Sequence, residues 1–168
     1  TLANGTLTIA AGQASGAISI AVVDDALDEA AETVIVTLSS PSNATLGSDT
    51  AHTYTINDDD ATPTVDFNVT SSNGAESVAA VVLTVDLSAI SSKDVTVDYA
   101  LTGTATGGGT DYTLANGTLT IAAGQASGTI SIVVVDDALY EAAETVIVTL
   151  SSPTNATLGS DTAHTYTI

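Results

Sequence analysis

The sequence is almost without positive charge. One of its 168 residues is a lysine (Lys93), none is an arginine and twenty are acidic, so the formal net charge is −19 at neutral pH. A protein that binds nucleic acid or an anionic membrane surface needs a basic footprint to neutralise phosphates. The composition therefore excludes both partners. It leaves two interpretations of the acidic surplus: a solubilising surface or a set of cation ligands.

Cysteine, methionine and tryptophan are missing as well. Without cysteine no disulfide supports the fold. No apolar run approaches the ~20 residues of a membrane-spanning helix, so we expect no membrane insertion. Hydrophobic residues make up 44% of the chain, which is enough to build a core and argues against disorder. A vocabulary of Thr, Ser, Ala, Val, Gly and Asp is typical of long secreted bacterial proteins, and we expect an extracellular or cell-surface location.

The most informative feature that is present is an internal repeat. Residues 1–56 return as residues 113–168, an offset of 112 positions, with four differences. The differing pairs are Ala17/Thr129, Ala21/Val133, Asp28/Tyr140 and Ser42/Thr154. A period this long at near identity indicates a tandem array of whole domains rather than a solenoid. Such an array is more typical of a stalk or a fibre than of an enzyme.

Apolar and polar residues alternate along most of the chain, with the period of half-buried strands. Val95, Val97 and Tyr99, for example, alternate with Thr96 and Asp98. Asn-Gly, Gly-Gly-Gly and Ser-Pro sequences separate the runs and favour turns. About seven short strands per unit predict an all-β fold, an immunoglobulin-like antiparallel β-sandwich. Only residues 138–143 look briefly helical.

Residues 58–63 have the character of a junction between repeats. Three successive aspartates lead to Pro63, which cannot donate to a strand ladder and stiffens the start of the next strand. We therefore expect a nearly complete repeat over residues 61–168. Residues 1–60 then form the C-terminal half of a preceding repeat.

The half repeat should be incomplete as a sandwich. Its predicted strands would have an uncovered apolar face and open edges, which is not stable in isolation. Either it belongs to a longer array of neighbouring repeats, or an identical chain supplies the missing strands by strand complementation. The predicted strands lie around Leu7 and over residues 18–22, 34–38 and 54–56.

The acidic residues are clustered where predicted strands end. Residues 24–32 and 136–144 share the pattern Asp-Asp-Ala-Leu-x-Glu-Ala-Ala-Glu, and residues 57–60 read Asn-Asp-Asp-Asp. Like charges within a few Å repel by ~1 kcal/mol per pair in water. With one lysine in the chain, a hard divalent cation is the natural counter-ion. Calcium (Ca2+) accepts about six to eight oxygen ligands in loose geometry, whereas magnesium requires a stricter octahedron and zinc favours His or Cys.

These motifs together resemble the Calx-beta domain, a family found in the regulatory loops of sodium/calcium exchangers and in long bacterial surface proteins. The resemblance covers essentially the whole chain as one and a half copies. It implies a calcium-binding β-sandwich. The motifs that carry it are Val-Val-Asp-Asp-Ala-Leu-x-Glu-Ala-Ala-Glu-Thr, the following Val-Thr-Leu-Ser-x-Pro, Tyr-Thr-Ile-Asn-Asp-Asp-Asp at residues 54–60, Gly-Gly-Thr-Asp-Tyr at residues 108–112 and Gly-Thr-Leu-Thr-Ile at residues 117–121.

The resemblance also implies a set of metal ligands. In the first repeat these would be Asp24, Asp25, the carbonyl of Leu27, Glu29, Glu32, Asp58, Asp59 and Asp60. In the second repeat they would be Glu76, Asp111, Asp136, Asp137, the carbonyl of Leu139, Glu141 and Glu144. Neither copy has the whole set, because the first lacks the counterparts of Glu76 and Asp111 and the second ends before its aspartate triplet.

Other polar residues have plainer interpretations. His52 and His164 each precede a tyrosine by two positions in a predicted strand, which indicates a place on a sheet face rather than zinc ligation. Lys93 lies in a Ser-Ser-Lys-Asp turn and is expected to be exposed. Tyr140 in place of Asp28 indicates that this position is not an essential ligand and that it can tune contact with a neighbouring domain. No aromatic platform and no Gly-x-Ser-x-Gly elbow is present, so we expect no enzyme.

The sequence thus predicts an extracellular calcium-binding structural repeat in the stalk of a surface adhesin or a similar long secreted protein. Its partners would be neighbouring repeats or identical chains. Two alternatives remain open. One is a self-assembling fibre subunit whose half repeat is completed by a neighbouring chain. The other is a ligand-binding adhesin module, although near-identical copies argue against it because binding tips are usually unique.

Overall fold

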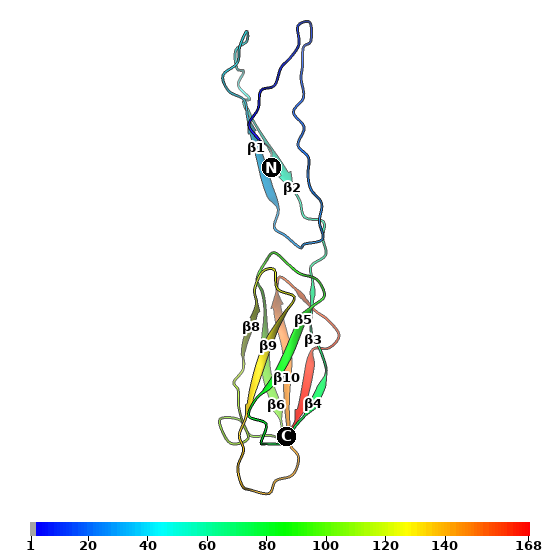
Figure 1. Ribbon diagram of the computed structural model, residues 1–168, viewed down its shortest axis with the longest axis vertical. Coiled ribbons are helices and arrows are strands. Elements are labelled where there is room, and N and C mark those ends of the chain that lie inside the picture. Colours follow the sequence, from blue (N-terminus) through cyan, green and yellow to red (C-terminus); the bar gives the residue numbers. More distant parts are fainter. Residues whose placement is uncertain (1–2) are drawn as a thin grey trace.

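The computed structural model describes residues 3–168 and contains two units arranged end to end (Figure 1). The first unit, residues 3–60, contains two strands, β1 (Glu32–Thr37) and β2 (Ala51–Ile56). The second unit, residues 61–168, contains strands β3 to β12. Residues 57–63 join the units, and the C-terminus lies at the far end of the second unit (Figure 1).

The second unit is a sandwich of two five-stranded sheets, which confirms the predicted fold class. One sheet has the order β4 (Ser71–Asn73), β12 (Ala163–Thr167), β10 (Thr145–Thr154), β6 (Val95–Gly103) and β8 (Gly117–Ile121). The other has the order β11 (Thr157–Leu158), β3 (Thr64–Phe67), β5 (Val81–Leu87), β9 (Ser127–Val134) and β7 (Tyr112–Thr113). The pairing is antiparallel except at two edges, where β11 pairs with β3 and β4 with β12 in parallel.

The inward side chains of both sheets form one core, because successive residues of a strand face opposite sides. Burying each such apolar side chain contributes about 1.5–3 kcal/mol. One sheet contributes Val95, Val97, Ile121, Val146, Val148, Leu150 and Tyr166, and the other Val65, Phe67, Leu83, Val85, Ile130, Ile132 and Val134. The alternation in the sequence therefore marks the core residues correctly.

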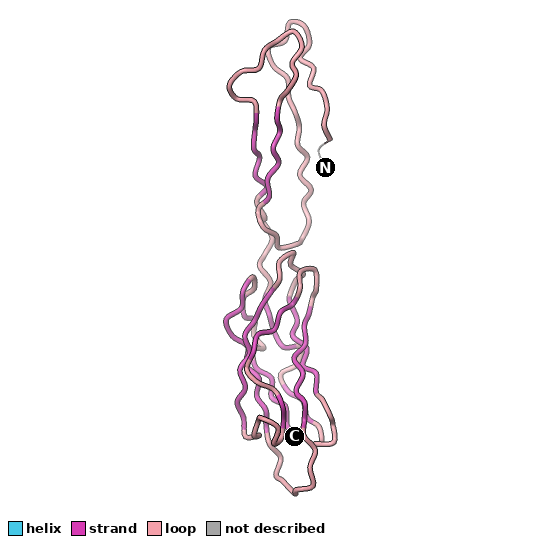
Figure 2. The backbone as a smooth tube through the Cα atoms, turned by 90° about the vertical axis from the view of Figure 1, so that its left-hand side faces the viewer, coloured by secondary structure: helices cyan, strands magenta, loops and turns pink. Residues whose placement is uncertain are grey.

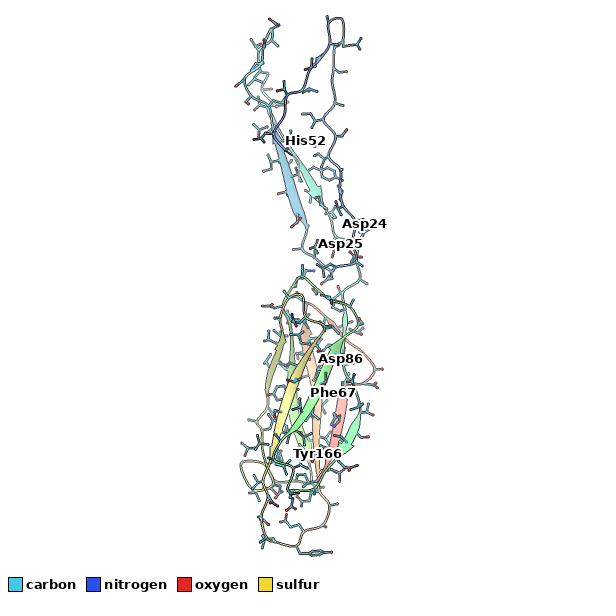
Figure 3. All side chains as sticks on the ribbon, viewed as in Figure 1. Asp24, Asp25, His52, Phe67, Asp86 and Tyr166 are labelled. Atoms are coloured by element: carbon cyan, nitrogen blue, oxygen red, sulfur yellow. The ribbon has the colours of Figure 1, made fainter. Side chains whose placement is uncertain are left out.

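His164 lies buried on the inward face of its sheet, as predicted, and is fully hydrogen-bonded. Its Nδ1 donates to the carbonyl of Val69 at 2.6 Å, and its Nε2 accepts from the hydroxyl of Ser72 at 2.8 Å. A carbonyl can only accept, so Nδ1 carries the proton. His52 has the equivalent place on β2 but is exposed, since no second sheet covers it (Figure 3).

The first unit keeps only the strand pair for which it contains both partners. Val34 pairs opposite Tyr54 there, in the register in which Val146 pairs opposite Tyr166 in the second unit. The strands predicted around Leu7 and over residues 18–22 do not form: these segments are extended but unpaired (Figure 2). Their counterparts β8 and β9 pair with β6 and β5. Residues 3–60 contain no equivalent of β5 or β6, so the prediction was wrong for lack of partners.

The apolar face of the first unit is uncovered, as predicted. Tyr166 is 1% exposed, whereas its counterpart Tyr54 is 42% exposed. Ile121 is 1% exposed, whereas its counterpart Ile9 is 50% exposed. The local sequences are the same, so the difference comes from the opposite sheet, which is present in only one of the two units.

Two local predictions were wrong. Residues 138–143 form a loop rather than a helical turn, because a segment this short cannot offset the cost of helix nucleation. The Ser-Pro sequence at residues 152–153 lies within β10 at an irregularity of the ladder between Ser151 and Thr154, and not in the turn between strands. No helix in residues 3–168 has the length and apolar character to cross a membrane.

Candidate metal centre

Each unit has an acidic pocket at the end where its last strand finishes. In the second unit the pocket lies beside Ile168, and in the first unit it lies beside Ile56 and the linker to the next unit. The two acidic loops therefore occupy equivalent places. The first one faces the junction between the units.

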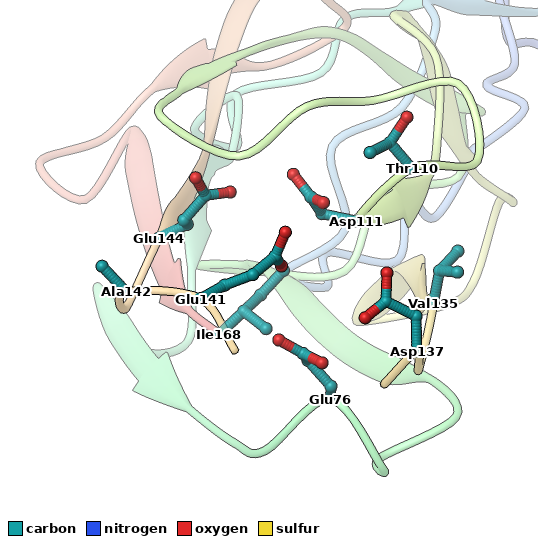
Figure 4. A pocket seen from close by; sticks show the side chains of 9 residues that line it. All are labelled: Glu76, Thr110, Asp111, Val135, Asp137, Glu141, Ala142, Glu144 and Ile168. Carbon is teal, nitrogen blue, oxygen red and sulfur yellow. The ribbon is translucent and has the colours of Figure 1, made fainter. Parts of the chain in front are cut away.

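The pocket of the second unit is small and mostly acidic (Figure 4). Its volume is about 10 Å³, which is enough for one ion or one water molecule. Asp136 and Leu139, which the resemblance implied as ligands (Leu139 through its carbonyl), do not line the pocket and are exposed to solvent. The other five implied residues line the pocket, namely Glu76, Asp111, Asp137, Glu141 and Glu144, together with Thr110, Val135, Ala142 and Ile168.

Asp111 is held by its own turn. Gly108 and Gly109 adopt φ values of 81° and 98°, which glycine tolerates and other residues rarely do. The turn brings Thr106 against Asp111: the Thr106 N–H donates to the Asp111 carboxylate, and the Asp111 N–H donates to the Thr106 carbonyl at 3.0 Å. The N–H of Val135 donates to the Asp111 carbonyl at 2.9 Å. The side chain therefore has a fixed place.

The acidic loop over residues 135–144 is fixed at both of its ends. Near its start, the Leu139 N–H donates to the Asp137 carboxylate at 2.6 Å. At its end, Glu144 pairs with Ile168 through two backbone hydrogen bonds of 3.2 Å and 2.9 Å. Glu141 lies between these points. The five carboxylates consequently come from three separate segments and face a common space (Figure 4).

Glu144 is electrostatically the most constrained of these acids. Its Oε2 is buried and has no hydrogen-bond donor. Its carboxyl can share a proton with Asp111, which is the main reason that the pKa of Glu144 is raised. Desolvation raises that pKa as well, followed by the charges of Asp111, Glu141 and Glu76. When both acids are ionised, this oxygen lacks any positive partner, so the site favours a proton or a cation there.

Glu141 follows the same pattern. Desolvation raises the pKa of Glu141, and the charges of Asp111, Asp137 and Glu76 raise it further. Within residues 3–168, no three Asp, Glu or His side chains are already arranged as ligands of one metal ion. Coordination of one ion therefore requires rotation of side chains other than Asp111, which its hydrogen bond with Thr106 holds in place.

The acids of the first unit gather at the junction. Asp58 in the linker accepts hydrogen bonds from the N–H of Glu29 at 3.0 Å and from the N–H of Asp60 at 3.3 Å. The acidic loop and the linker are therefore in contact. The pocket between them is open and contains Asp24, Asp25, Glu29, Glu32, Asp58, Asp59 and Asp60, but not Leu27.

The charges in this junction cluster act on one another. Desolvation first, and then the charges of Asp25, Glu32, Asp58 and Asp60, raise the pKa of Glu29. The pKa of Asp60 is raised in the same way, by desolvation and then by Asp58, Asp59, Asp24 and Asp25. The N–H of Leu27 donates to Asp25 at 2.9 Å, as that of Leu139 does to Asp137. The two loops therefore begin alike.

Sequence reasoning missed one feature of the junction. Lys93, predicted to be exposed, is half-buried with 29% of its side chain accessible, and its Nζ donates to Asp28 Oδ1 at 2.9 Å. The prediction was wrong because the turn that holds Lys93 packs against the first unit. Two features of the sequence could have indicated this contact. The chain has a single lysine, and the aspartate at position 28 is replaced by tyrosine in the second copy.

Comparisons with known proteins bear on this architecture. The sequence model of the Calx-beta domain matches residues 1–60 and again residues 58–167. The fold is similar to the crystal structure of the apo-form Calx CBD1 domain, with 24% identity, a TM-score of 0.58 and coverage of 64% of this chain and 96% of that one. It is also similar to the crystal structure of CBD12 from CALX1.2, with 22% identity, a TM-score of 0.57 and coverage of 62% and 42%.

A third similar structure is the calcium binding domain CBD12 of CALX1.1, with 22% identity, a TM-score of 0.55 and coverage of 62% of this chain and 44% of that one. The chain thus spans less than half the length of the two CBD12 structures. At these identities the structural likeness establishes the β-sandwich fold alone. The family model goes further, because its two matches extend from the first residue to residue 167. The chain therefore belongs to the Calx-beta domain family.

Proposed function

We propose that the chain is a calcium-binding structural repeat in the stalk of an extracellular or cell-surface protein such as an adhesin. The observation that carries the proposal is the buried Glu144 Oε2, which has no donor although four other carboxylates line the same pocket. A buried carboxylate oxygen without a partner is costly. A bound cation would satisfy it and neutralise its neighbours at the same time.

The chemistry of the pocket favours calcium among the common cations. All the side chains that would hold the ion offer oxygen, and no cysteine or histidine lines the pocket. In the second unit the ligands would be Glu76, Asp111, Asp137, Glu141 and Glu144. Calcium supplies two positive charges and accepts oxygen ligands in variable number and geometry, which suits carboxylates that are not yet in coordination positions.

The junction cluster gives the same ion a structural role. Asp58 and Asp60 belong to the linker, whereas Asp25 and Glu29 belong to the loop of the first unit. A cation shared between them would tie the linker to the loop and stiffen the joint. We further propose that the repeats divide at about residue 60, so that each joint in an array would carry such a cluster. Calcium is abundant outside cells, and its binding there would stiffen the stalk.

Calcium should raise the thermal stability of the chain. At a concentration of about 100 times Kd, binding adds ~2.7 kcal/mol, which corresponds to ~10 °C for a domain of this size. The measurement is thermal unfolding followed by tyrosine fluorescence and circular dichroism, with calcium added after EDTA. Magnesium at the same concentration serves as the ionic control and should have a much smaller effect.

A matched set of variants assigns the effect to the pocket. Glu144→Gln should raise the midpoint in EDTA, since it removes an uncompensated charge, and it should reduce the increment from calcium. Asp137→Asn should also reduce that increment. Asp161→Asn removes the same charge at an exposed position outside the pocket and should leave the increment unchanged. A response that is equally large in all three variants would contradict a site at this pocket.

A second candidate function is favoured by the uncovered face of the first unit. Its apolar residues are those that the opposite sheet covers in the second unit, so strands of the β3 to β6 type would fit there. Each chain contains one set of such strands and two half repeats that need them. Copies of this chain alone therefore leave one half repeat uncovered, and full completion needs strands from a further repeat. Assembly that grows with concentration would support complementation by a neighbouring chain, and a monomer at every concentration would contradict it.

A further inference from the structure

Asp28 makes a buried, hydrogen-bonded contact between the two units. It is 4% exposed although it belongs to an acidic loop, and it accepts hydrogen bonds from all three residues of the turn at residues 91–93. The Ser91 hydroxyl donates to Oδ2 at 2.8 Å, the Ser92 N–H donates to the Asp28 carbonyl at 3.0 Å, and Lys93 Nζ donates to Oδ1 at 2.9 Å. Asp28 and Ser91 also form a parallel β-bridge.

The receiving turn is itself rigidly held. Ser91 is 1% exposed, its hydroxyl accepts from the Lys93 N–H at 3.1 Å, and its carbonyl accepts from the Gly124 N–H at 2.9 Å. Lys93 is the only lysine or arginine in the chain. The only lysine side chain of the sequence thus lies at the boundary between the units and in neither acidic pocket.

The other copy of the loop cannot make this contact. Position 28 corresponds to Tyr140, which is fully exposed at the tip of the second acidic loop, beside the largely exposed Leu139. Tyrosine has no charge for a lysine and offers one hydroxyl where aspartate offers two carboxylate oxygens. It is also too large for a position that is closed on the side of Ser91. Two loops that are otherwise the same therefore differ in the one side chain that reaches across the junction.

We propose that Asp28, Ser91, Ser92 and Lys93 form a repeat latch that fixes the orientation of one unit on the next without any metal ion. The partner surface for an acidic loop is the Ser-Ser-Lys turn of the following repeat. Aspartate at the loop tip makes the joint stiff, and tyrosine leaves it free. The inference does not depend on calcium binding, since none of the four residues lines either acidic pocket.

The test measures the distance between the units in EDTA. The chain has no cysteine, so Thr37→Cys and Thr149→Cys add two unique spin-label sites at equivalent exposed positions of β1 and β10. Pulsed electron paramagnetic resonance should give a single narrow distance peak. Asp28→Tyr, which copies the second loop, should lose that peak and give a broad distribution. Tyr140→Asp is the matched control and should keep the peak.

Two milder variants guard against misfolding. Asp28→Asn keeps the shape of the side chain and removes the negative charge of the ion pair. Lys93→Ala removes the positively charged partner and leaves Asp28 in place. Both should broaden the distribution while the circular dichroism spectrum stays that of the parent. A broad distribution in the parent chain would overturn the proposal, and so would a peak that survives in Asp28→Tyr. A peak that forms only after calcium is added would overturn the claim of metal independence and leave the proposed calcium function intact.

Discussion

Glu144 lies at the end of a loop and at the start of β10, and that position explains its unusual electrostatics. Its backbone pairs with Ile168 through two hydrogen bonds, which places its side chain at the edge of the acidic pocket. Its Oε2 ends buried beside other acids. The fold therefore brings several negative charges together at this point, and protons or a cation must neutralise them.

Stability without calcium should consequently rise as the pH falls from 7 towards 4.5, the ordinary pKa of a glutamate side chain. The folded state holds protons on Glu141 and Glu144 more tightly than the unfolded state does, because the pKa of each is raised above the ordinary 4.5. Unfolding then releases protons, so the free energy of unfolding decreases as pH rises through these raised pKa values. Urea unfolding in EDTA at a series of pH values measures the slope, and Glu144→Gln should flatten it.

Calcium should reverse that trend, because protons and calcium compete for the same oxygens. Asp28 acts in the opposite direction at lower pH: its hydrogen bond with Lys93 lowers the pKa of Asp28 below the ordinary 3.8 against the effect of burial. The stability that it contributes is therefore lost only as pH falls below about that value. For Glu141 and Glu144, a free energy of unfolding in EDTA that stays constant from pH 7 down to 4.5 would contradict the raised pKa values.

The sequence was informative about one class of residue and not about another. Asp111, Asp137, Glu141 and Glu144 belong to motifs in which the residue types and spacing are themselves the signal. The partner of Asp28 is Lys93, 65 positions further on and in the other unit. No periodicity connects residues across a boundary between repeats, since periodicity reports only which face of a strand is buried. Such a pair has to be seen in space.

At the scale of elements, one sequence has two structures. Residues 117–121 are strand β8 and residues 127–134 are strand β9, whereas residues 5–9 and 15–22, their near-identical counterparts, are unpaired. Alternation of apolar residues predicts that a segment is suited to a strand. Whether the strand forms depends on hydrogen-bonding partners that lie elsewhere in the chain. This is why the alternation predicted the second unit well and the first unit only in part.

Amide hydrogen exchange should separate the two copies. The amides of β8 and β9 should be protected, those of residues 5–9 and 15–22 should exchange close to the rate of an open chain, and those of β1 should be intermediate. Nearly equal sequences have nearly equal intrinsic rates, so each amide is compared with its counterpart 112 positions away. Nuclear magnetic resonance on a dilute sample in EDTA gives the measurement.

The concentration dependence of the exchange provides the control. Protection of residues 15–22 that increases with protein concentration would mean that another chain covers them. Equal protection in both copies at the lowest concentration would contradict the unpaired state of the first unit. The comparison thus also bears on complementation by strands from a neighbouring chain.

At the scale of the whole molecule, charge of one sign dominates. A net charge of −19 in 168 residues, with the only lysine engaged at the junction, leaves long-range repulsion largely uncompensated. Repulsion of this kind keeps a protein soluble and destabilises its compact state. It acts between the units as well as within the acidic pockets.

Added salt should therefore stabilise the chain in EDTA. Raising sodium chloride shortens the screening length from about 10 Å at 0.1 M to about 3 Å at 1 M, and the free energy of unfolding should rise by ~1 kcal/mol or more. Chemical unfolding in urea, which is uncharged, measures it, with sucrose at equal osmolality as the control for solvent effects. Falling stability would mean that the attraction between Lys93 and Asp28 outweighs the summed repulsion.

The direction of the strands in the second unit has a consequence for a chain under tension. β11 runs parallel to β3, and β12 runs parallel to β4, so the chain enters the sandwich and leaves it while running the same way, at opposite ends (Figure 1). A pull on the two ends draws β3 and β12 lengthwise past their neighbours. All the hydrogen bonds of each ladder are then loaded in shear at the same time, so they cannot be broken one after another.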